Sequence, residues 1–212
     1  CALPICIGIT QEALATTVDE ALAHAARIGY PVALKVQSPD ISHKTEAKAV
    51  RLGIATPEAL AAAHADIVAN ARAYRADARI DGVLVQEMVA DGVECILGVT
   101  NDPLFGPAVM FGLGGIFAEV LKDVAFRVAP VTRPEAQDMI REIRGFAVLD
   151  GARGRPACDL DALADAIVRV SALAVDLEAE VAELDINPLF VFARGQGVKA
   201  ADALIRPRAP AP

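Results

Sequence analysis

The sequence predicts a mixed α/β fold, which can also be classed as α+β, in which helices and strands follow one another without strict alternation. Alanine-rich stretches that open with helix-starting residues indicate helices, and short apolar runs bounded by Gly, Pro, Asn or Asp indicate strands. Glycine-containing turns between neighbouring apolar runs indicate hairpins. The 212 residues, 54% of them hydrophobic, suffice for one domain with a substantial core or for two smaller subdomains.

Residues that start and stop regular structure set the expected boundaries. Thr17 and Glu20 have the spacing of a capping box, and Gly29 follows the helix that they begin. Thr56 followed by Pro57 is another favoured helix start. We expect helices over about 18–28, 57–74, 133–144 and 160–180, and strands over about 31–36, 51–55, 83–89, 93–100, 181–187, 189–193 and 198–201.

Turn residues suggest which strands are neighbours. Asp91-Gly92 predicts a hairpin between the strands at 83–89 and 93–100. The run Arg194-Gly195-Gln196-Gly197 joins the last two predicted strands. The proline-rich end, residues 206–212, is expected to be a loose tail.

Charge and cysteine content limit the classes of partner and the compartment. Twenty basic and 28 acidic residues give a net charge of −8, which argues against a nucleic-acid partner, and no run of 18 apolar residues suggests a membrane span. The cysteines include no C-x-x-C pair, and Cys95 and Cys158 are expected to be buried free thiols in a reducing cytoplasm. The chain has no signal-peptide layout, and because it starts with Cys1 we expect a piece of a longer polypeptide or one subunit of a pair.

Two segments far apart in the chain carry the residues best suited to chemistry. In the first, Lys35 ends an apolar strand and His43 lies in the following loop. An ammonium group can reach phosphate oxygens, and a neutral imidazole is a nucleophile toward phosphorus. In the second, strand alternation puts Glu183, Asp185 and Asn187 on one face, where they repel one another unless a cation or a polar site meets them. Together they suggest a site for a magnesium nucleotide with a histidine able to accept a phosphoryl group.

The order of these motifs resembles the ATP-grasp domain of NDP-forming acyl-CoA synthetases, which include the β subunit of ADP-forming acetyl-CoA synthetase and relatives of succinyl-CoA synthetase. The resemblance covers residues 13–205 and is carried by segments 29–46, 83–89, 92–128 and 183–202. It implies an ATP-grasp fold with subdomains at about 11–85 and 86–205, each a mixed or antiparallel sheet with helices, and a nucleotide cleft between them. It also implies an acid–thiol ligase that forms carbon–sulfur bonds, with ATP/ADP and Mg²⁺ as cofactors. The CoA-binding and ligase domains, or an α subunit, would be partners in an oligomer.

The resemblance also implies roles for individual residues. His43 corresponds to the histidine that relays the phosphoryl group, and Asp185 to the carboxylate that orients it. Asn187 and Asp202 correspond to the residues that hold Mg²⁺. The nucleotide contacts implied are Lys35 with the phosphates, Glu87 and Val89 with the adenine through backbone groups, and Glu94 with the ribose hydroxyls.

Two departures from the family pattern keep other functions open. Lys48-Ala49 stand where the family has Gly-Gly, and Asp202-Ala203-Leu204 replaces Asp-Ala-Arg. These departures favour, as an alternative, a regulatory nucleotide-binding domain that does not relay phosphate. Another alternative is an ATP-grasp carboxylate–amine ligase, which needs no histidine relay. The candidate residues also have simpler interpretations that involve no function. Lys35 is then a strand-end lysine and His43 a surface-loop histidine, and the acids and amide of 183–187 lie on the solvent face of an edge strand.

Overall fold

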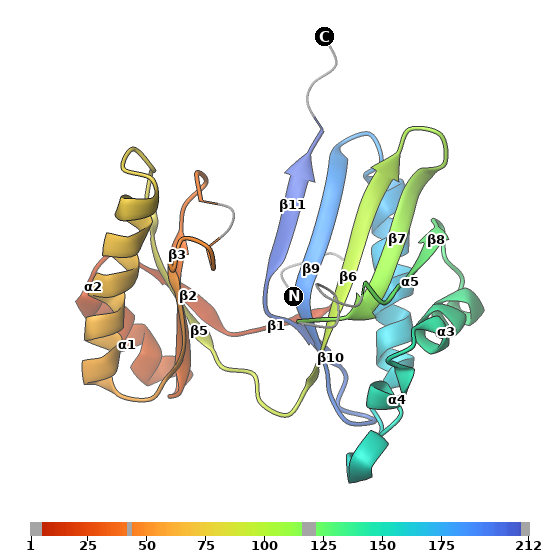
Figure 1. Cartoon of the computed structure of the whole chain (residues 1–212), viewed down its shortest axis with the longest axis horizontal. Coiled ribbons are helices and arrows are strands. Elements are labelled where there is room, and N and C mark those ends of the chain that lie inside the picture. The colour runs from red at the N-terminus through yellow and green to blue at the C-terminus, as the bar shows by residue number, and fades with distance from the viewer. Residues whose placement is uncertain (1–5, 42–43, 116–121, 209–212) are drawn as a thin grey trace. The chain divides into compact units, whose positions relative to one another are not determined.

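The computed structural model describes residues 6–41, 44–115 and 122–208, which belong to two compact units (Figure 1). The smaller unit is Thr10–Ala90. The larger unit contains the chain from Asp91 onward together with the segment that ends at Ile9. Each unit has its own sheet, its own helices and its own core, and each is described by itself. The family resemblance implies subdomains of about 11–85 and 86–205.

The smaller unit is an antiparallel sheet with two helices on one face (Figure 1). The strands lie in the order β2-β5-β3-β4. Their bounds, with those of the helices, are β2 Glu12–Ala15, α1 Val18–Ile28, β3 Val32–Gln37, β4 Val50–Ile54, α2 Pro57–Tyr74 and β5 Gly82–Glu87. Leu34 of the central strand β3, together with Leu60 and Ile67 of α2, is fully buried in the core between sheet and helices.

Both helices of this unit begin where the sequence predicts. The Thr17 hydroxyl accepts a hydrogen bond from the Glu20 N–H at 3.2 Å, and the Thr56 hydroxyl accepts one from the Ala59 N–H at 3.2 Å. These bonds satisfy backbone donors that have no partner within the helix. The Glu20 carboxylate reaches back to the Thr16 N–H at 2.7 Å, one residue earlier than a capping box at Thr17 requires.

The larger unit is a seven-stranded sheet in which helices α3 and α5 pack against one face (Figure 1). The strand order is β1-β10-β9-β6-β7-β8, and β11 also pairs with β9. All neighbouring strands are antiparallel except β1 and β10. The bounds are β1 Gly8–Ile9, β6 Val93–Asp102, β7 Gly106–Leu113, β8 Val124–Val128, α3 Arg133–Glu142, α4 Phe146–Leu149, α5 Leu160–Asp176, β9 Val181–Val191, β10 Val198–Ala200 and β11 Ala203–Pro207.

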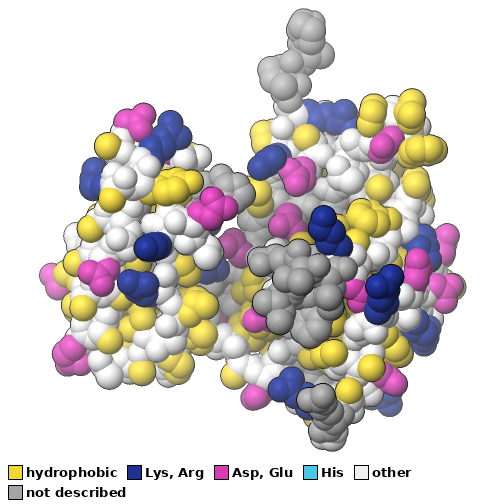
Figure 2. Space-filling model, viewed as in Figure 1, with side chains coloured by type: hydrophobic (Ala, Val, Ile, Leu, Met, Phe, Trp, Pro, Cys, Tyr) yellow, Lys and Arg dark blue, Asp and Glu magenta, His cyan; other side chains and the backbone are white. Residues whose placement is uncertain are grey.

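The two faces of this sheet differ in burial. Leu97 of β6, Phe111 of β7 and Ile186 of β9 are fully buried toward the helices. Residues at alternate positions, such as Glu94 and Phe126, are exposed. Hydrophobic side chains also gather at the tip of the β6–β7 hairpin (Figure 2), where Leu104 is 85% exposed. The side chains that face away from α3 and α5 are therefore the ones available to a ligand.

The predicted hairpin around Asp91-Gly92 is wrong. β5 pairs with β2 and β3 in the smaller unit, whereas β6 pairs with β7 and β9 in the larger unit. Asp91 does adopt the positive φ of a tight turn, at 65°, but the turn connects two sheets. Turn residues determine the backbone conformation only locally. Pairing with strands that are distant in sequence determines to which sheet β5 and β6 belong.

Other boundaries differ from the prediction by a few residues. β9 runs without a break from Val181 to Val191, with a register shift opposite Cys95–Leu97, where two separate strands were expected. β11 continues to Pro207, so the expected loose tail does not begin at Arg206. α5 ends at Asp176, and turns follow it up to Glu180. The sequence prediction did not include strands β1, β2, β7, β8 and β11. None of the helices in the described parts of the chain has both the length and the apolarity that crossing a membrane requires.

The turn at Lys48 is the basis of a stability prediction. Lys48 has a positive φ of 50°, which costs energy for a residue with a Cβ atom. We expect Lys48→Gly to raise the free energy of unfolding by about 0.5–1 kcal/mol, because glycine adopts this conformation without steric strain. Urea denaturation measures the change.

Gly53 provides the matched control. It has a φ of 68° and no atom within 4 Å of where a Cβ would lie, so Gly53→Ala changes backbone conformational preference alone. It should lower stability by about 1 kcal/mol. A loss of stability in Lys48→Gly would mean that the Lys48 side chain contributes more than its backbone conformation costs.

Candidate functional site

The predicted site residues are divided between the two units. Lys35, Glu87 and Val89 belong to the smaller unit, and Glu94, Asp185, Asn187 and Asp202 belong to the larger unit. His43 lies outside the described residues. The site is therefore built up from each unit separately.

Lys35 lies on the face of the smaller sheet opposite the helices. Its neighbours along β3, Leu34 and Val36, are fully buried, whereas Lys35 is half-buried. It pairs with Val50 of β4 and with Leu84 of β5. A half-buried ammonium group on this face is suited to phosphate, since it is held in place and still reachable.

A buried glutamine shares this face and was not singled out from the sequence. Gln86 is 3% exposed and donates to the Thr10 hydroxyl at 2.7 Å and to the Glu12 carboxylate at 2.8 Å. It lies opposite Ala33 of β3, so it points to the same side of the sheet as Lys35. The sequence signal was an amide directly after the apolar run Val83-Leu84-Val85.

Glu87 and Val89 lie where the smaller unit ends. Glu87 is the last residue of β5, and its N–H donates to the Gln11 carbonyl at 2.9 Å. Val89 is half-buried and precedes the unit boundary at Ala90. The N–H of Glu87 is therefore already bonded within its own unit.

Glu94 in the larger unit lies against two glycines. The Gly114 N–H donates to the Glu94 carbonyl at 2.8 Å. A Cβ atom on Gly114 would lie 3.2 Å from the Glu94 carbonyl carbon, and one on Gly115 would lie 3.7 Å from the carboxylate oxygen Oε2. The close approach to Glu94 therefore leaves little room for a side chain at Gly114. The carboxylate itself is on the exposed face, where it can accept hydrogen bonds from hydroxyl groups.

Asp185 lies on the same face, across from two positions without polar side chains. Gly98 of β6 is its partner on one side and Leu204 of β11 on the other. A Cβ on Gly98 would lie 3.8 Å from the Asp185 oxygen Oδ1. Burial raises the pKa of Asp185 above its ordinary value of 3.8, and the negative charges of Glu183 and Asp202 raise it further.

Asn187 and Asp202 are direct neighbours between β9 and β11. The Asn187 N–H donates to the Asp202 carbonyl at 3.1 Å, and the Asp202 oxygen Oδ1 accepts from the Ala203 N–H at 3.0 Å. Glu183, by contrast, forms an ion pair with Arg206 at 3.1 Å. Three of the predicted residues, Asp185, Asn187 and Asp202, are thus brought together by the pairing of β9 with β11.

This oxygen-rich group fits a divalent cation. Among the described residues, no three or more His, Cys, Asp or Glu side chains are grouped so as to hold a metal ion. Mg²⁺ needs only one or two protein oxygens, because it keeps several waters and contacts nucleotide phosphates. The pKa of Asp185 is raised first by burial and then by the neighbouring carboxylates of Glu183 and Asp202, and a bound cation would favour the charged form against both.

The cysteines have no role in this group. Cys95 and Cys158 are free and buried, as predicted. Burial raises the pKa of both thiols, so neither is a reactive thiolate at neutral pH.

Comparison with known proteins places the chain in a family. Residues 5–206 match the ATP-grasp domain family, and the chain belongs to it. The chain is 50% identical, over 94% of its length and 84% of the relative's, to the β subunit of acetate–CoA ligase [ADP-forming] II from Pyrococcus furiosus. It is 47% identical to acetate–CoA ligase [ADP-forming] I from Archaeoglobus fulgidus, but spans only 28% of that longer chain.

Solved structures agree with the fold. The dinucleotide-forming acetyl-coenzyme A synthetase 1 of Ca. Korarchaeum cryptofilum, in complex with coenzyme A, Ca-AMPCP and HgCl⁺, is 39% identical with a TM-score of 0.90, covering 96% of this chain and 88% of that one. A further structure of that enzyme with Mg-AMPPCP, 37% identical with a TM-score of 0.80 over 96% and 87% of the two chains, is described as having its phosphohistidine segment pointing towards the nucleotide binding site. The predicted ATP-grasp fold is confirmed.

Replacing Asp185 tests the cost of its negative charge, which burial and the neighbouring carboxylates impose. Native Asp185 keeps its proton to higher pH than unfolded Asp185, so stability falls as the pH rises from 3.8 through its raised native pKa. We expect Asp185→Asn to stabilise the metal-free protein at pH 7, with the gain disappearing below pH 3.8, where both states are protonated. Thermal unfolding across this pH range measures it.

Leu204→Arg is the matched second variant. It places a guanidinium directly across the strand pair from Asp185 and should stabilise the metal-free protein at pH 7 by offsetting the same charge. If both variants were less stable than the original chain at pH 7, the charge of Asp185 would not be a significant cost to stability.

Proposed function

We propose that this chain is the nucleotide-binding, phosphoryl-transferring component of an ADP-forming acyl-CoA synthetase, an acid–thiol ligase. The observation that carries the proposal is the similarity, over nearly the whole chain, to the β subunit of an ADP-forming acetate–CoA ligase. Half-buried Lys35 and the oxygen-bearing face around Asp185 support it, since phosphates need a fixed cation and a metal needs hard oxygen ligands.

The proposed reaction step transfers the γ-phosphoryl group of ATP to His43. One imidazole nitrogen attacks the γ-phosphorus, a P–N bond forms, and the bond from phosphorus to the β,γ-bridging oxygen breaks. ADP leaves with that electron pair, and the imidazole gives up one ring proton to solvent. The reverse step returns the phosphoryl group to ADP. Asp185 would orient the imidazole by accepting a hydrogen bond from its other nitrogen.

The remaining residues would bind the nucleotide. Lys35 would contact the phosphates, and Glu94 would accept hydrogen bonds from the ribose hydroxyls. The backbone at Glu87 and Val89 would meet the adenine. Asn187 and Asp202 would hold Mg²⁺, which neutralises phosphate charge when it is bound.

Partners and location follow from the same proposal. CoA binding and acyl-phosphate chemistry would belong to other domains of the same polypeptide or to an α subunit, and the parts would form an oligomer. The range of relatives supports both arrangements, since this chain spans most of one β subunit and about a quarter of a longer ligase. We propose a cytoplasmic location, with no nucleic-acid or membrane partner.

A second candidate is a domain that binds nucleotide without relaying phosphate. Leu204 favours it, because an apolar side chain lies directly across from Asp185 where a guanidinium could balance its charge. This candidate predicts ATP binding by calorimetry with no phosphorylated His43.

Radiolabelling tests the leading proposal. The chain is incubated with γ-labelled ATP and Mg²⁺, and an acid-labile, base-stable label is expected on the protein. His43→Ala should lower the label by about 100-fold or more, because the nucleophile is removed. A chelator should also abolish labelling.

His24→Ala is the matched control, since His24 lies on helix α1 of the same unit. It should keep the label of the original chain. Equal label in His43→Ala and the original chain, or no label in either, would contradict the relay.

A further inference from the structure

Five neighbouring strands of the larger sheet each place one residue in a single row (Figure 1). The register pairs Asp185 of β9 with Leu204 of β11 on one side and with Gly98 of β6 on the other. Gly98 pairs in turn with Met110 of β7, and Met110 with Phe126 of β8. Directly paired residues point to the same side of a sheet, so the row lies on the face that carries Asp185. Gly98 is the one position of this row without a side chain.

The backbone at Gly98 does not require glycine. Its φ lies outside the left-handed region in which a residue with a Cβ atom is strained. A Cβ atom at this position would lie 3.4 Å from the Met110 methyl carbon Cε, 3.5 Å from the Leu184 carbonyl oxygen and 3.8 Å from the Asp185 oxygen Oδ1. These are ordinary van der Waals distances, so the fold has room for an alanine.

Gly112 of the same sheet shows the contrast. A Cβ atom there would lie 2.7 Å from the Asp123 carbonyl oxygen and 2.8 Å from the Val124 carbon Cγ1, so the packing of β7 against β8 requires a glycine. A glycine that the packing does not require costs stability in a strand, because it loses more conformational freedom on folding than alanine and has no side chain to pack. The fold by itself therefore favours a larger residue than glycine at position 98.

The end of the Met110 side chain occupies the room at Gly98. Its methyl carbon lies next to the place that a Cβ atom would take, and the Asp185 carboxylate lies on the other side of that place. Gly98 is buried, whereas Met110 and Asp185 are half-buried. Methionine is unbranched and has three rotatable bonds, so its end settles wherever the neighbouring residues leave room. Because position 98 is empty, Met110 lies beside the carboxylate.

We propose that Gly98 is a positioning residue for the ligand of Asp185: by giving the end of Met110 a place to lie, it keeps the carboxylate open to a divalent cation and to the phosphate oxygens around that cation. The proposal rests on the proposed function and adds Gly98 and Met110 to it. A methyl group at position 98 would take up this room and press the end of Met110 towards the ligand. Crowding of this kind weakens binding, because a cation with its waters and phosphate oxygens needs a defined space.

Gly98→Ala tests the proposal through two effects of opposite sign. It should raise the melting temperature by about 1 to 4 °C, because alanine loses less conformational freedom on folding. It should weaken the binding of Mg²⁺ with AMPPCP, an ATP analogue with a methylene group in place of the β,γ-bridging oxygen, by about 10-fold. Scanning calorimetry measures the melting temperature, and titration calorimetry on the whole chain measures the affinity. A purely structural role of Gly98 would change both in the same direction.

A double variant tests the part played by Met110. Met110→Ala removes the side chain that Gly98→Ala displaces, so the combination should bind Mg²⁺ with AMPPCP within about threefold of the original chain. The single variant Met110→Ala completes the double-mutant cycle. A double variant that binds as weakly as Gly98→Ala would overturn the proposal, because Met110 would then not transmit the effect.

Val128→Ile is the matched control for the added carbon atom. Val128 of β8 pairs with Ala108 on the same face of the sheet, and it is 53% exposed. The variant adds one carbon at the edge of the sheet and should bind Mg²⁺ with AMPPCP within about twofold of the original chain. A loss equal to that of Gly98→Ala would overturn the proposal, because position 98 would then have no particular effect.

Methionine methyl resonances observe the site in the original chain. The chain has three methionines, of which Met110 lies beside Asp185 and Met139 is fully buried on α3. With Mn²⁺ and AMPPCP, the unpaired electrons of the metal should broaden the Met110 methyl resonance more strongly than that of Met139. Equal broadening of the two resonances, or none at Met110, would overturn the proposal, because the cation would then not lie beside Asp185.

The affinities separate failure of this proposal from failure of the proposed function. Equal affinity in Gly98→Ala and the original chain would overturn the positioning role. A loss of affinity together with a lower melting temperature would also overturn it, because that result would show general damage to the sheet. Absence of Mg²⁺–AMPPCP binding by the original chain would instead refute the proposed function, and the positioning role with it.

Discussion

The alternation of residues along β9 is the constraint on which the site of the larger unit depends. Leu184 and Ile186 are buried toward the helices, so Glu183, Asp185 and Asn187 must lie on the opposite face. β6 and β11 fix this register from the two sides. A slip of one residue would bury the acids and expose the two hydrophobic side chains, which the free energy of apolar burial opposes. Burial of two apolar residues thus sets the place of three oxygen-bearing side chains.

The same register creates an electrostatic cost. Glu183 has Arg206 as an ion-pair partner, but Asp185 faces Gly98 and Leu204 and has Glu183 and Asp202 near it. Its raised pKa means that the folded chain disfavours the charged form. Groups kept in such surroundings are typical of sites that bind a cation or carry out proton and phosphoryl chemistry.

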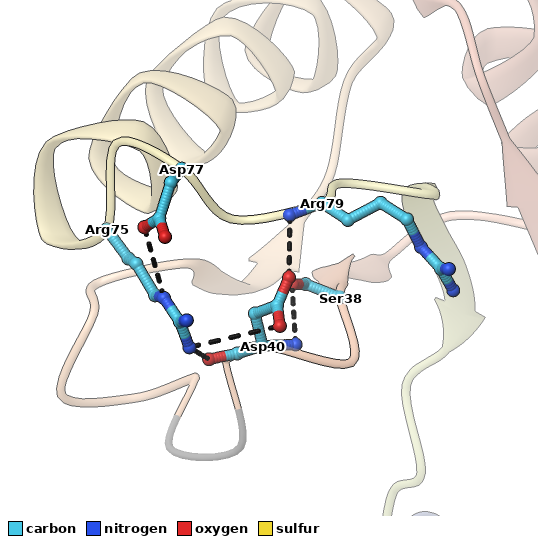
Figure 3. Close-up of polar contacts among 5 residues, drawn as sticks. All are labelled: Ser38, Asp40, Arg75, Asp77 and Arg79. Atoms are coloured by element: carbon cyan, nitrogen blue, oxygen red, sulfur yellow. Dashed lines mark hydrogen bonds and ion pairs between the residues drawn. The ribbon is translucent and has the colours of Figure 1, made fainter.

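The smaller unit holds its candidate residues in place by different contacts. Lys35 is held by strand pairing on both sides. The connection that contains His43 is held at its start by Asp40 and Ile41 and at its end by the turn through Lys48. The first attachment is made by side chains, of which Figure 3 shows those around Asp40, whereas backbone hydrogen bonds make most of the second. Such a segment can be altered by single substitutions that leave the sheet intact, because the core around Leu34 is separate from the cluster around Ile41.

The sequence by itself determined the local structure and the identity of the chemical groups. The starts of α1 and α2 followed from Thr17 and Thr56, the face of Asp185 followed from strand alternation, and the burial of Cys95 followed from its apolar surroundings. Only the tertiary structure decided that β5 and β6 belong to different sheets, that Leu204 lies opposite Asp185, and that Asp40 meets Arg75 and Arg79. The physical reason is that capping and alternation act between residues close in sequence, whereas strand partners and loop contacts are chosen by burial across the whole unit.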